Sequence, residues 1–319
     1  MTKFFVLTGF LGSGKTTLLR SFLATPEAAD TGVIVNEVGE IGLDGAILAE
    51  GAGGLPVAQL ANGCVCCSLG SDLEFTVDAL IASRSDAPLR RIVLETSGIS
   101  KPGPILRALS GLAAHRLGLE VVCTFDCTRG EAIAGFEEAA AQLSGAHTVV
   151  LTKRDAAGAM DEPRARRTVA GFNPIAGVVV APSRHDAALA AFSLERQGGF
   201  FPTGGFRCDD GAAHPRIRAI AAEQDAPVAW EHVAAWFDNL AGRLGDRLLR
   251  TKGLLEIAGM PRRVLVESVG TTFAQPRLFG RDSDGSGFLV LVGRDIDTAM
   301  LQEVEPAVPL RFGGSPQPR

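Results

Sequence analysis

Short apolar runs alternate with amphipathic stretches along the first part of the chain. The apolar runs are rich in residues that favour strands, and several of them are separated by stretches with helical periodicity. Strands are predicted at 4–7, 31–36, 90–95, 119–126, 147–152 and 175–181, and helices at 17–23, 102–115 and 131–143. This alternation predicts an α/β fold, in which a mostly parallel sheet carries helices on both faces.

The pattern changes near residue 198, where glycine, proline and polar residues interrupt the alternation. We predict a linker at 198–213 between a first domain, residues 1–197, and a second domain, residues 214–319. The strands and helices predicted in the second domain are 217–221, 230–249 (helix), 253–257, 264–269, 288–292 and 296–304 (helix). This mixture predicts a smaller α+β domain with a core of its own.

The composition is that of a globular chain with enough apolar residues for two cores. Of the 319 residues 46% are hydrophobic, and 31 basic against 36 acidic side chains give a net charge of −5. This charge gives no electrostatic reason to expect a nucleic-acid or anionic-membrane partner. No signal-peptide pattern and no apolar run of about 18 residues is visible, so we expect a cytoplasmic protein with reduced thiols.

The first apolar run leads into a glycine-rich loop with the pattern of a phosphate-binding P-loop. Residues 9–17 read GFLGSGKTT, after a predicted strand and before a predicted helix. In such a loop backbone N–H groups form an anion-binding nest, and the helix adds the positive end of its dipole. A glycine-rich turn with a chance lysine is the alternative, and the flanking strand and helix count against it.

This motif predicts a specific role for each polar side chain. We expect Lys15 to reach the β- and γ-phosphates of a nucleotide, the Thr16 hydroxyl to hold Mg²⁺, and Thr17 to face the α-phosphate. The residues predicted to surround the phosphates are Gly9, Gly12, Ser13, Gly14, Lys15, Thr16 and Thr17.

The predicted strand at 90–95 ends in a carboxylate, Glu95, and a glycine follows at Gly98. In nucleoside triphosphatases an acid at this place lies near Mg²⁺ or the attacking water, and a glycine N–H can sense the γ-phosphate. We therefore predict that Glu95 acts with Lys15 in catalysis and that Gly98 contacts the nucleotide.

The predicted strand at 147–152 ends in a Thr-Lys-x-Asp sequence formed by Thr152, Lys153 and Asp155. An aspartate held at a strand end can accept hydrogen bonds from guanine N1–H and N2–H₂, which adenine does not offer, and the lysine stem can lie along the base. A site built on such pairing discriminates strongly, because the wrong base leaves polar groups unpaired. The tetrapeptide alone is a weak signal. After a P-loop and a strand, it predicts GTP.

Three of the six cysteines, Cys64, Cys66 and Cys67, fall within four positions. Thiolates at this spacing can converge on one soft or borderline cation such as Zn²⁺ or Cu(I). A fourth cysteine or histidine is missing nearby, so one position stays open for a distant residue, a water or an exchanging partner. Three inert core cysteines are the alternative.

A loop dense in glycine and carboxylate, residues 37–45, follows the predicted strand at 31–36. In open α/β sheets ligands bind beyond the carboxyl ends of the strands, so this loop is also placed to meet a ligand. A plain surface loop is the alternative.

In their order along the chain, these motifs resemble those of the CobW-type P-loop GTPases, the CobW/HypB/UreG-like metallochaperones. The likeness rests on residues 9–17, 36–40, 62–67, 95–98 with Pro102, and 152–155, and residues 248–253 are similar to part of the family's C-terminal domain. It covers nearly the whole chain, and the Cys-x-Cys-Cys element after a P-loop is its most specific mark. The resemblance implies a P-loop NTPase fold and a GTPase of low intrinsic rate.

The resemblance also implies roles for the residues between the first two nucleotide motifs. It makes Cys64, Cys66 and Cys67 the ligands of a transferred metal ion and places Glu37 and Glu40 in a switch that responds to the nucleotide. Glu37 is also predicted to be a further metal ligand.

Three positions depart from the family pattern. Val38 stands where phenylalanine is more common, Lys101 where an acidic residue is common, and Thr152 where many GTPases have asparagine. A histidine-rich tract, which some members carry, is absent, since the chain has only five scattered histidines. We therefore expect one transferable ion rather than metal storage.

These expectations describe a cytoplasmic GTPase that uses Mg²⁺ and GTP and delivers a Zn²⁺ or Co²⁺-like ion to a client metalloprotein or a metal-cofactor pathway such as cobalamin biosynthesis. The oligomeric state is open. One alternative is a P-loop small-molecule kinase or transferase with structural cysteines, although a lid with clustered arginines is not visible. Another is a zinc-dependent interaction module that nucleotide only regulates.

Overall fold

The computed structural model describes residues 2–35, 57–59, 69–84, 88–195, 215–279 and 286–313. The chain divides into two compact units, one made of Met1–Arg167 with Ala176–Gly199 and the other of Thr168–Ile175 with Phe200–Arg319. The predicted linker at 198–213 lies outside the described residues. The domain bounds of 1–197 and 214–319 therefore stay a prediction.

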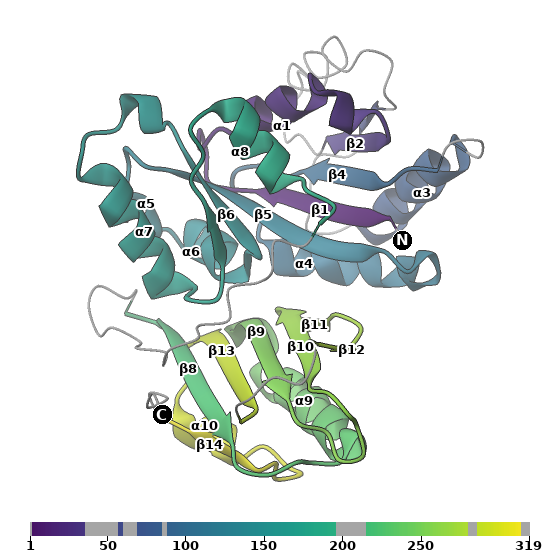
Figure 1. Cartoon of the computed structure of the whole chain (residues 1–319), viewed down its shortest axis with the longest axis vertical. Coiled ribbons are helices and arrows are strands. Elements are labelled where there is room, and N and C mark those ends of the chain that lie inside the picture. The colour runs from purple at the N-terminus through teal and green to yellow at the C-terminus, as the bar shows by residue number, and fades with distance from the viewer. Residues whose placement is uncertain are drawn as a thin grey trace. The chain divides into compact units, whose positions relative to one another are not determined.

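A parallel sheet is the centre of the first unit (Figure 1). Within the described residues its strands are β1 (Lys3–Thr8), β2 (Thr31–Val35), β3 (Val57–Gln59), β4 (Arg91–Glu95), β5 (Gly118–Asp126), β6 (Thr148–Thr152) and β7 (Gly177–Val179). They lie in the order β3-β2-β4-β1-β5-β6-β7, and every neighbouring pair is parallel. The central strands are apolar throughout because helices bury both faces of the sheet.

Helices cover this sheet on both faces, as the sequence predicts. The described helices of the first 195 residues are α1 (Lys15–Leu23), α3 (Leu69–Ala82), α4 (Pro102–Ala108), α5 (Glu131–Ala134), α6 (Glu137–Gly145), α7 (Asp161–Phe172) and α8 (Arg184–Ala191), with short 3₁₀ turns at Pro26–Ala28, Leu109–His115 and Arg154–Ala156. Helices α1 and α8 pack on one face, where Leu19, Phe22 and Phe192 join the buried core. Helices α4 and α6 lie on the opposite face (Figure 1).

The strand order places several chemically interesting residues at one edge of the sheet. Strand β1 lies between β4 and β5, and the register pairs Leu7 with Glu95 and Asp126 with Thr152. The strand order reverses at β1, and this reversal opens the crevice in which α/β proteins bind ligands. The loops after β4, β5 and β6 therefore lie around the P-loop, which follows β1.

The second unit is an antiparallel sheet with one long helix. Its described elements are β8 (Ile217–Gln224), α9 (Trp230–Leu244), β9 (Leu248–Leu255), β10 (Val264–Val269), β11 (Thr272–Phe273), β12 (Arg277–Leu278), β13 (Phe288–Arg294), α10 (Thr298–Gln302) and β14 (Leu310–Phe312), with a 3₁₀ turn at Gly245–Arg247. The sheet order is β11-β10-β9-β13-β8-β14, and β12 pairs with β10. Helix α9 buries Trp236, Phe237 and Leu240 against one face, so the predicted α+β class is confirmed.

Several predicted boundaries are wrong for local physical reasons. The helix predicted at 230–249 ends at Leu244, because Gly245 adopts a φ of 51° that stops the helix, and residues 248–249 open strand β9. The helix predicted at 131–143 is two helices, since Phe136 leaves the helical conformation and stacks on Phe10 at 4.9 Å. The helix predicted at 102–115 changes to a 3₁₀ turn after Ala108. Helices α3, α7 and α8 and strand β3 are not among the predicted elements.

None of the helices in the described residues combines the length and the apolar character that crossing a bilayer requires.

Candidate functional site

The P-loop joins β1 to α1 and needs glycine at three positions. Gly9, Gly12 and Gly14 have φ angles of 144°, 72° and 94°, a region that residues with a side chain avoid. A Cβ on Gly9 would lie 2.3 Å from Thr124 Oγ1, so the loop packs directly against β5. The glycines therefore let the backbone turn and approach its neighbour at the same time.

Lys15 is the first residue of α1, and its side chain points back over the loop. Its Nζ donates to the carbonyl oxygen of Gly9 at 2.8 Å, and the residue is 9% exposed. An anion held by the loop would meet this ammonium together with the N-terminal end of α1. The two contributions make the P-loop a favourable place for phosphate.

Thr16 and Glu95 form a pair of oxygen ligands beside the P-loop. The Thr16 hydroxyl donates to Glu95 Oε1 at 2.6 Å, and Glu95 is buried at the end of β4. Mg²⁺ binds through hard oxygen ligands such as a carboxylate and a hydroxyl. The residues present therefore fit the metal ion predicted here.

A cavity of about 590 Å³ lies over this pair. It is lined by Leu11, Gly12, Gly14, Lys15, Thr16, Thr17, Val35, Glu95, Thr96, Ser97, Gly98, Ile99 and Lys153. Val35 ends β2 and pairs with Glu95 on the neighbouring strand β4, so the ends of β1, β2, β4 and β6 contribute to one space. The structure thus brings the predicted Lys15, Thr16, Glu95 and Gly98 together.

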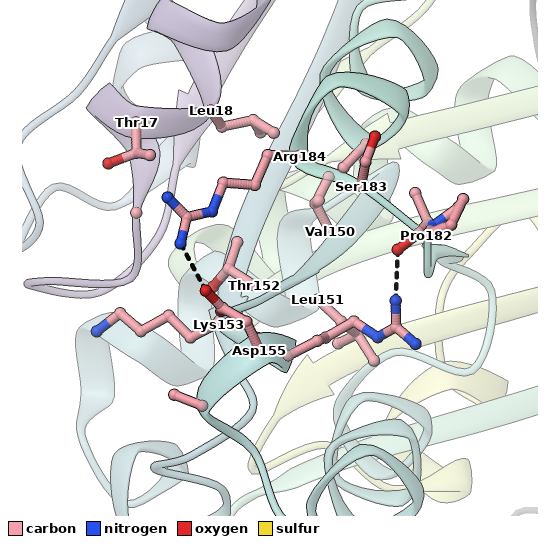
Figure 2. Close-up of a pocket in the computed structure, with 15 residues that line it drawn as sticks. Thr17, Leu18, Val150, Leu151, Thr152, Lys153, Asp155, Pro182, Ser183 and Arg184 are labelled. Atoms are coloured by element: carbon pink, nitrogen blue, oxygen red, sulfur yellow. Dashed lines mark hydrogen bonds and ion pairs between the residues drawn. The ribbon is translucent and has the colours of Figure 1, made fainter.

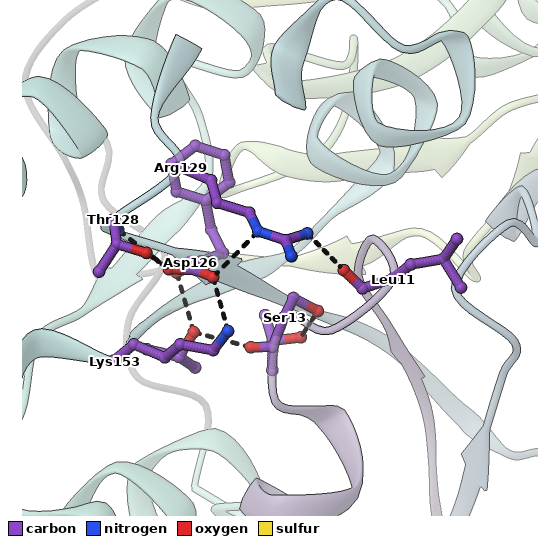
Figure 3. A network of polar contacts seen from close by, with 9 residues as sticks. Leu11, Ser13, Asp126, Thr128, Arg129 and Lys153 are labelled. Carbon is purple, nitrogen blue, oxygen red and sulfur yellow. Dashed lines mark hydrogen bonds and ion pairs between the residues drawn. The ribbon is translucent and has the colours of Figure 1, made fainter. Parts of the chain in front are cut away.

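Hydrogen bonds connect the P-loop to the ends of β5 and β6 (Figure 3). The Ser13 and Thr124 hydroxyls lie 2.6 Å apart. The Thr152 hydroxyl is 2.7 Å from the carbonyl oxygen of Ser13 and 3.1 Å from that of Phe125. Thr152 therefore connects the P-loop to the end of β5 through its hydroxyl, at a position where many GTPases have asparagine.

Asp126, the last residue of β5, is the centre of this network (Figure 3). Its buried carboxylate lies 2.8 Å from Lys153 Nζ and 3.7 Å from Arg129, and it accepts from the Thr128 backbone and hydroxyl. Burial alone would raise the pKa of Asp126, but Lys153 and Thr128 outweigh it and lower the pKa. Arg129 also donates to the carbonyl oxygen of Leu11 at 3.0 Å. The carboxylate thus holds two cations beside the P-loop.

A second cavity, of about 500 Å³, lies at the end of β6 (Figure 2). The two cavities share Gly14, Thr17 and Lys153. Leu18 and Val150 supply apolar walls, and Asp155 and Arg184 lie at its edge. Lys153 has a φ of 55°, and this turn places Asp155 beyond the strand end. The predicted Thr152, Lys153 and Asp155 all line this cavity.

Two arginines join the loops on either side of the second cavity. Arg184 Nη2 lies 2.7 Å from Asp155 Oδ2, and this hydrogen bond is the main cause of the lowered pKa of Asp155. Arg154, from the loop that holds Asp155, donates to the carbonyl oxygen of Ala181 in the loop before α8. It also pairs with Glu162 at 2.9 Å. The carboxylate predicted to read guanine is therefore engaged by a cation in this structure.

The sequence predictions lack several polar residues of the site, among them Asp126, Arg129, Arg154 and Arg184. Asp126 carries a usable signal, because it ends a predicted strand as Glu95 does. Arg184 carries no such signal, because its partner Asp155 is 29 residues away in sequence.

The predicted metal ligands Cys64, Cys66, Cys67 and Glu37 lie outside the described residues. Cys123 and Cys127 are buried, as expected for core cysteines, and burial is the largest cause that raises their pKa values to about 12 and about 11. Both remain thiols at neutral pH. In the part of the chain that the structure describes, no group of three or more His, Cys, Asp or Glu side chains is placed to hold a metal ion.

Two family models match the sequence. Residues 3–180 match the model described as CobW/HypB/UreG, nucleotide-binding domain. Residues 217–304 match the model described as Cobalamin synthesis protein cobW C-terminal domain. Together they cover both compact units and confirm the predicted resemblance.

Curated relatives match over most of their length. Zinc chaperone YjiA of Escherichia coli (strain K12) is 32% identical, and the match covers 88% of this chain and 87% of the relative. Zinc chaperone CobW of Pseudomonas aeruginosa is 31% identical, with 93% and 88% covered.

Solved structures also match both units. The crystal structure of Zn(II)-bound YjiA GTPase from E. coli has a TM-score of 0.67 at 26% identity and covers 95% of this chain and 97% of the other. A Zn(II)-bound variant of that GTPase, in which a glutamate and two cysteines are replaced by alanine, also has a TM-score of 0.67, at 25% identity, and covers 95% and 98%. The predicted P-loop fold with a separate C-terminal domain is confirmed.

Proposed function

Because this chain belongs to the CobW/HypB/UreG family of P-loop GTPases, we propose that it binds and hydrolyses GTP and carries zinc to a client protein. One observation carries the proposal. Lys15, the Thr16–Glu95 pair and Asp155 line two adjoining cavities that share Gly14, Thr17 and Lys153. A phosphate end and a base end in neighbouring cavities fit a nucleoside triphosphate.

At the phosphate end, the P-loop N–H groups and Lys15 bind the phosphates. The Lys15 ammonium, now on the Gly9 carbonyl, reaches the β- and γ-phosphates when they enter the loop. Thr16 and Glu95 would hold Mg²⁺, which neutralises charge on the phosphates. Glu95 orients the attacking water, and Gly98 meets the γ-phosphate.

At the base end, Asp155 accepts from guanine and Lys153 supports the base plane. Lys153 reaches Asp126 through its ammonium, so its aliphatic stem is free to lie beside the base. The apolar walls at Leu18 and Val150 bury the flat ring faces.

The proposed cargo is zinc, bound by Cys64, Cys66 and Cys67 with Glu37 as a further ligand. Relatives named zinc chaperones support zinc over cobalt. The cysteine segment lies in sequence between β3 and α3, and the segment that holds Glu37 begins after Val35, which pairs with Glu95. Loss of the γ-phosphate beside Glu95 is therefore proposed to alter both segments and release the metal. The client protein and a link to cobalamin biosynthesis stay predictions.

The proposal is tested with the purified full chain. Fluorescent GDP is displaced by GTP and by ATP, and phosphate release from GTP is followed over many turnovers with and without one equivalent of zinc. We expect GTP to compete at least ~100-fold better than ATP, because adenine lacks the two N–H donors that guanine offers to Asp155. Preference for ATP, or transfer of phosphate to a small-molecule acceptor instead of water, would support the kinase alternative. Binding without turnover would support the interaction module.

Replacing Asp155 by asparagine should reverse the base preference. The amide offers a donor to the C2 carbonyl of xanthine, where the carboxylate can only accept. We expect GTP to bind at least ~10-fold more weakly and xanthosine triphosphate more tightly, measured by competition against labelled nucleotide. Asp161→Asn, a nearby carboxylate that accepts from the Gly158 backbone, is the matched control. An Asp155→Asn chain that keeps its guanine preference would remove the aspartate from base recognition.

Replacing Arg184 by alanine should tighten the binding of neutral guanosine. Guanine must displace Arg184 from Asp155. Because an exposed ion pair of this kind contributes little free energy, we expect the guanosine affinity to increase by roughly 1.5- to 5-fold. Added salt screens the pair and should tighten guanosine binding to the wild type but not to the variant. Arg166→Ala, which removes a pair with Glu162, is the control. Weaker guanosine binding by Arg184→Ala would instead make the arginine part of the base site.

A further inference from the structure

Gln142 on α6 holds two backbone carbonyls of the loop that follows Glu95. Its Nε2 donates to the carbonyl oxygen of Gly98 at 3.0 Å and to that of Ser100 at 2.9 Å, and the residue is fully buried. Both neighbours are acceptors, so the nitrogen of the carboxamide must face them. A buried glutamine with two such bonds to one loop fixes the path of that loop.

The loop that Gln142 holds forms one wall of the first cavity, which is the phosphate end of the site. Gly98 and Ile99 line this cavity together with Lys15 and Thr16. Gly98 also packs so closely on the P-loop that an added Cβ would lie 2.8 Å from the backbone nitrogen of Leu11. The loop is therefore packed between the P-loop and α6.

The clamp determines which way the backbone donors of the loop point. In a planar trans peptide the N–H points opposite to the C=O of the same unit. With the Gly98 carbonyl directed at Gln142, the Ile99 N–H is directed away from α6. The Ser100 carbonyl is held in the same way. The Gly98 and Ser100 carbonyls thus face Gln142, and the N–H groups of the same two peptide units point to the other side, where one of them can meet an anion.

We propose that Gln142 is a positioning residue for the γ-phosphate, which rests on the proposed function of the site. It acts through Gly98 and Ile99 and does not touch the nucleotide. GDP lacks the group that meets this loop, so the clamp contributes to GTP binding and not to GDP binding. Gln142 thereby sets the preference for the triphosphate state.

The same helix carries an exposed contact to the loop that serves as a control. Lys101 and Glu137 lie 3.3 Å apart, with 37% and 49% of their side chains exposed. A pair with this exposure contributes little to the loop position. Glu137→Gln should therefore leave the discrimination between GTP and GDP unchanged.

The test compares affinities for a slowly hydrolysed analogue, GTPγS, and for GDP by calorimetry on the full chain. Gln142→Met keeps the side-chain length and removes the donors. We expect it to bind GTPγS about 5- to 50-fold more weakly and GDP within twofold of the wild type, since two buried hydrogen bonds are lost. Gln142→Asn, which keeps the amide but shortens its reach, should give a smaller loss in the same direction.

The outcomes separate this inference from the proposed function. A wild-type chain that binds neither nucleotide would refute the proposed function itself. If the wild type binds both and Gln142→Met weakens them equally, or weakens neither, the positioning role is wrong. Should both variants fail to fold, exchange of the Gln142 carboxamide protons is followed by NMR in the wild type. Slower exchange with GTPγS than with GDP is expected, and equal exchange would overturn the inference.

Discussion

Replacing Lys15 by alanine is expected to weaken GTP binding by at least ~100-fold, or about 3 kcal/mol. The ammonium lies inside the P-loop on the Gly9 carbonyl, with nine-tenths of the residue buried, and alanine at this position removes its contact to the phosphates. Charge-assisted bonds to phosphate are among the strongest that a protein makes. Calorimetric titration with Mg²⁺·GTP and Mg²⁺·GDP measures the loss, and both nucleotides should lose affinity because both carry the β-phosphate.

The fold should survive this substitution. Lys15 donates to the Gly9 carbonyl, and a hydrogen bond from a charged group contributes roughly 1.5–3 kcal/mol. The melting temperature should therefore fall by roughly 3–12 °C. Lys101→Ala is the matched control, since this lysine is on the neighbouring loop but pairs with Glu137. Unchanged GTP affinity in Lys15→Ala would exclude the P-loop as the phosphate site.

The fold of the first unit follows closely from local sequence, and the reasons are physical. Strands such as β1 and β5 are buried on both faces, so their sequences are continuous apolar runs that stand out. Strand β3 has only three residues, too few for a periodic signal. Helix α7 is rich in charged residues, but Ala165, Val169 and Phe172 form a buried face at helical spacing, so its pattern was predictable. The end of α9 was missed because Gly245 stops the helix through its backbone conformation rather than through a change in polarity.

The residues of the candidate site also fall into two groups, those that sequence motifs predict and those that depend on tertiary contacts. Lys15, Thr16 and Asp155 belong to short motifs whose spacing along the chain already encodes the geometry. Gln142 gains its role from partners distant in sequence, with 44 positions separating it from Gly98, and the Lys153 partner of Asp126 follows a different strand. Such contacts arise from the sheet order and the packing of α6, which a single sequence does not specify.

Replacing Cys64, Cys66 and Cys67 together by serine should remove tight zinc binding. A serine hydroxyl stays protonated at neutral pH and is a poor zinc ligand, so we expect the affinity to fall at least ~100-fold. Zinc is titrated against a chromophoric chelator. Cys127→Ala is the control, because burial raises the pKa of this thiol to about 11 and keeps it protonated. A related GTPase still binds Zn(II) after loss of a glutamate and two cysteines, so affinity and stoichiometry have to be measured.

GTP and zinc should also bind cooperatively if this chain uses nucleotide to release its cargo. Mg²⁺·GTP should tighten zinc by about 5- to 150-fold relative to Mg²⁺·GDP, and linkage then requires zinc to tighten GTP by the same factor. Zinc affinity should rise with pH in both states, because the thiolates must lose their protons to bind. In the triple serine variant the coupling should vanish while GTP binding to the zinc-free chain stays within twofold. Equal zinc affinities in the two nucleotide states would leave a GTPase whose metal site is independent of its nucleotide, and metal release would need another trigger.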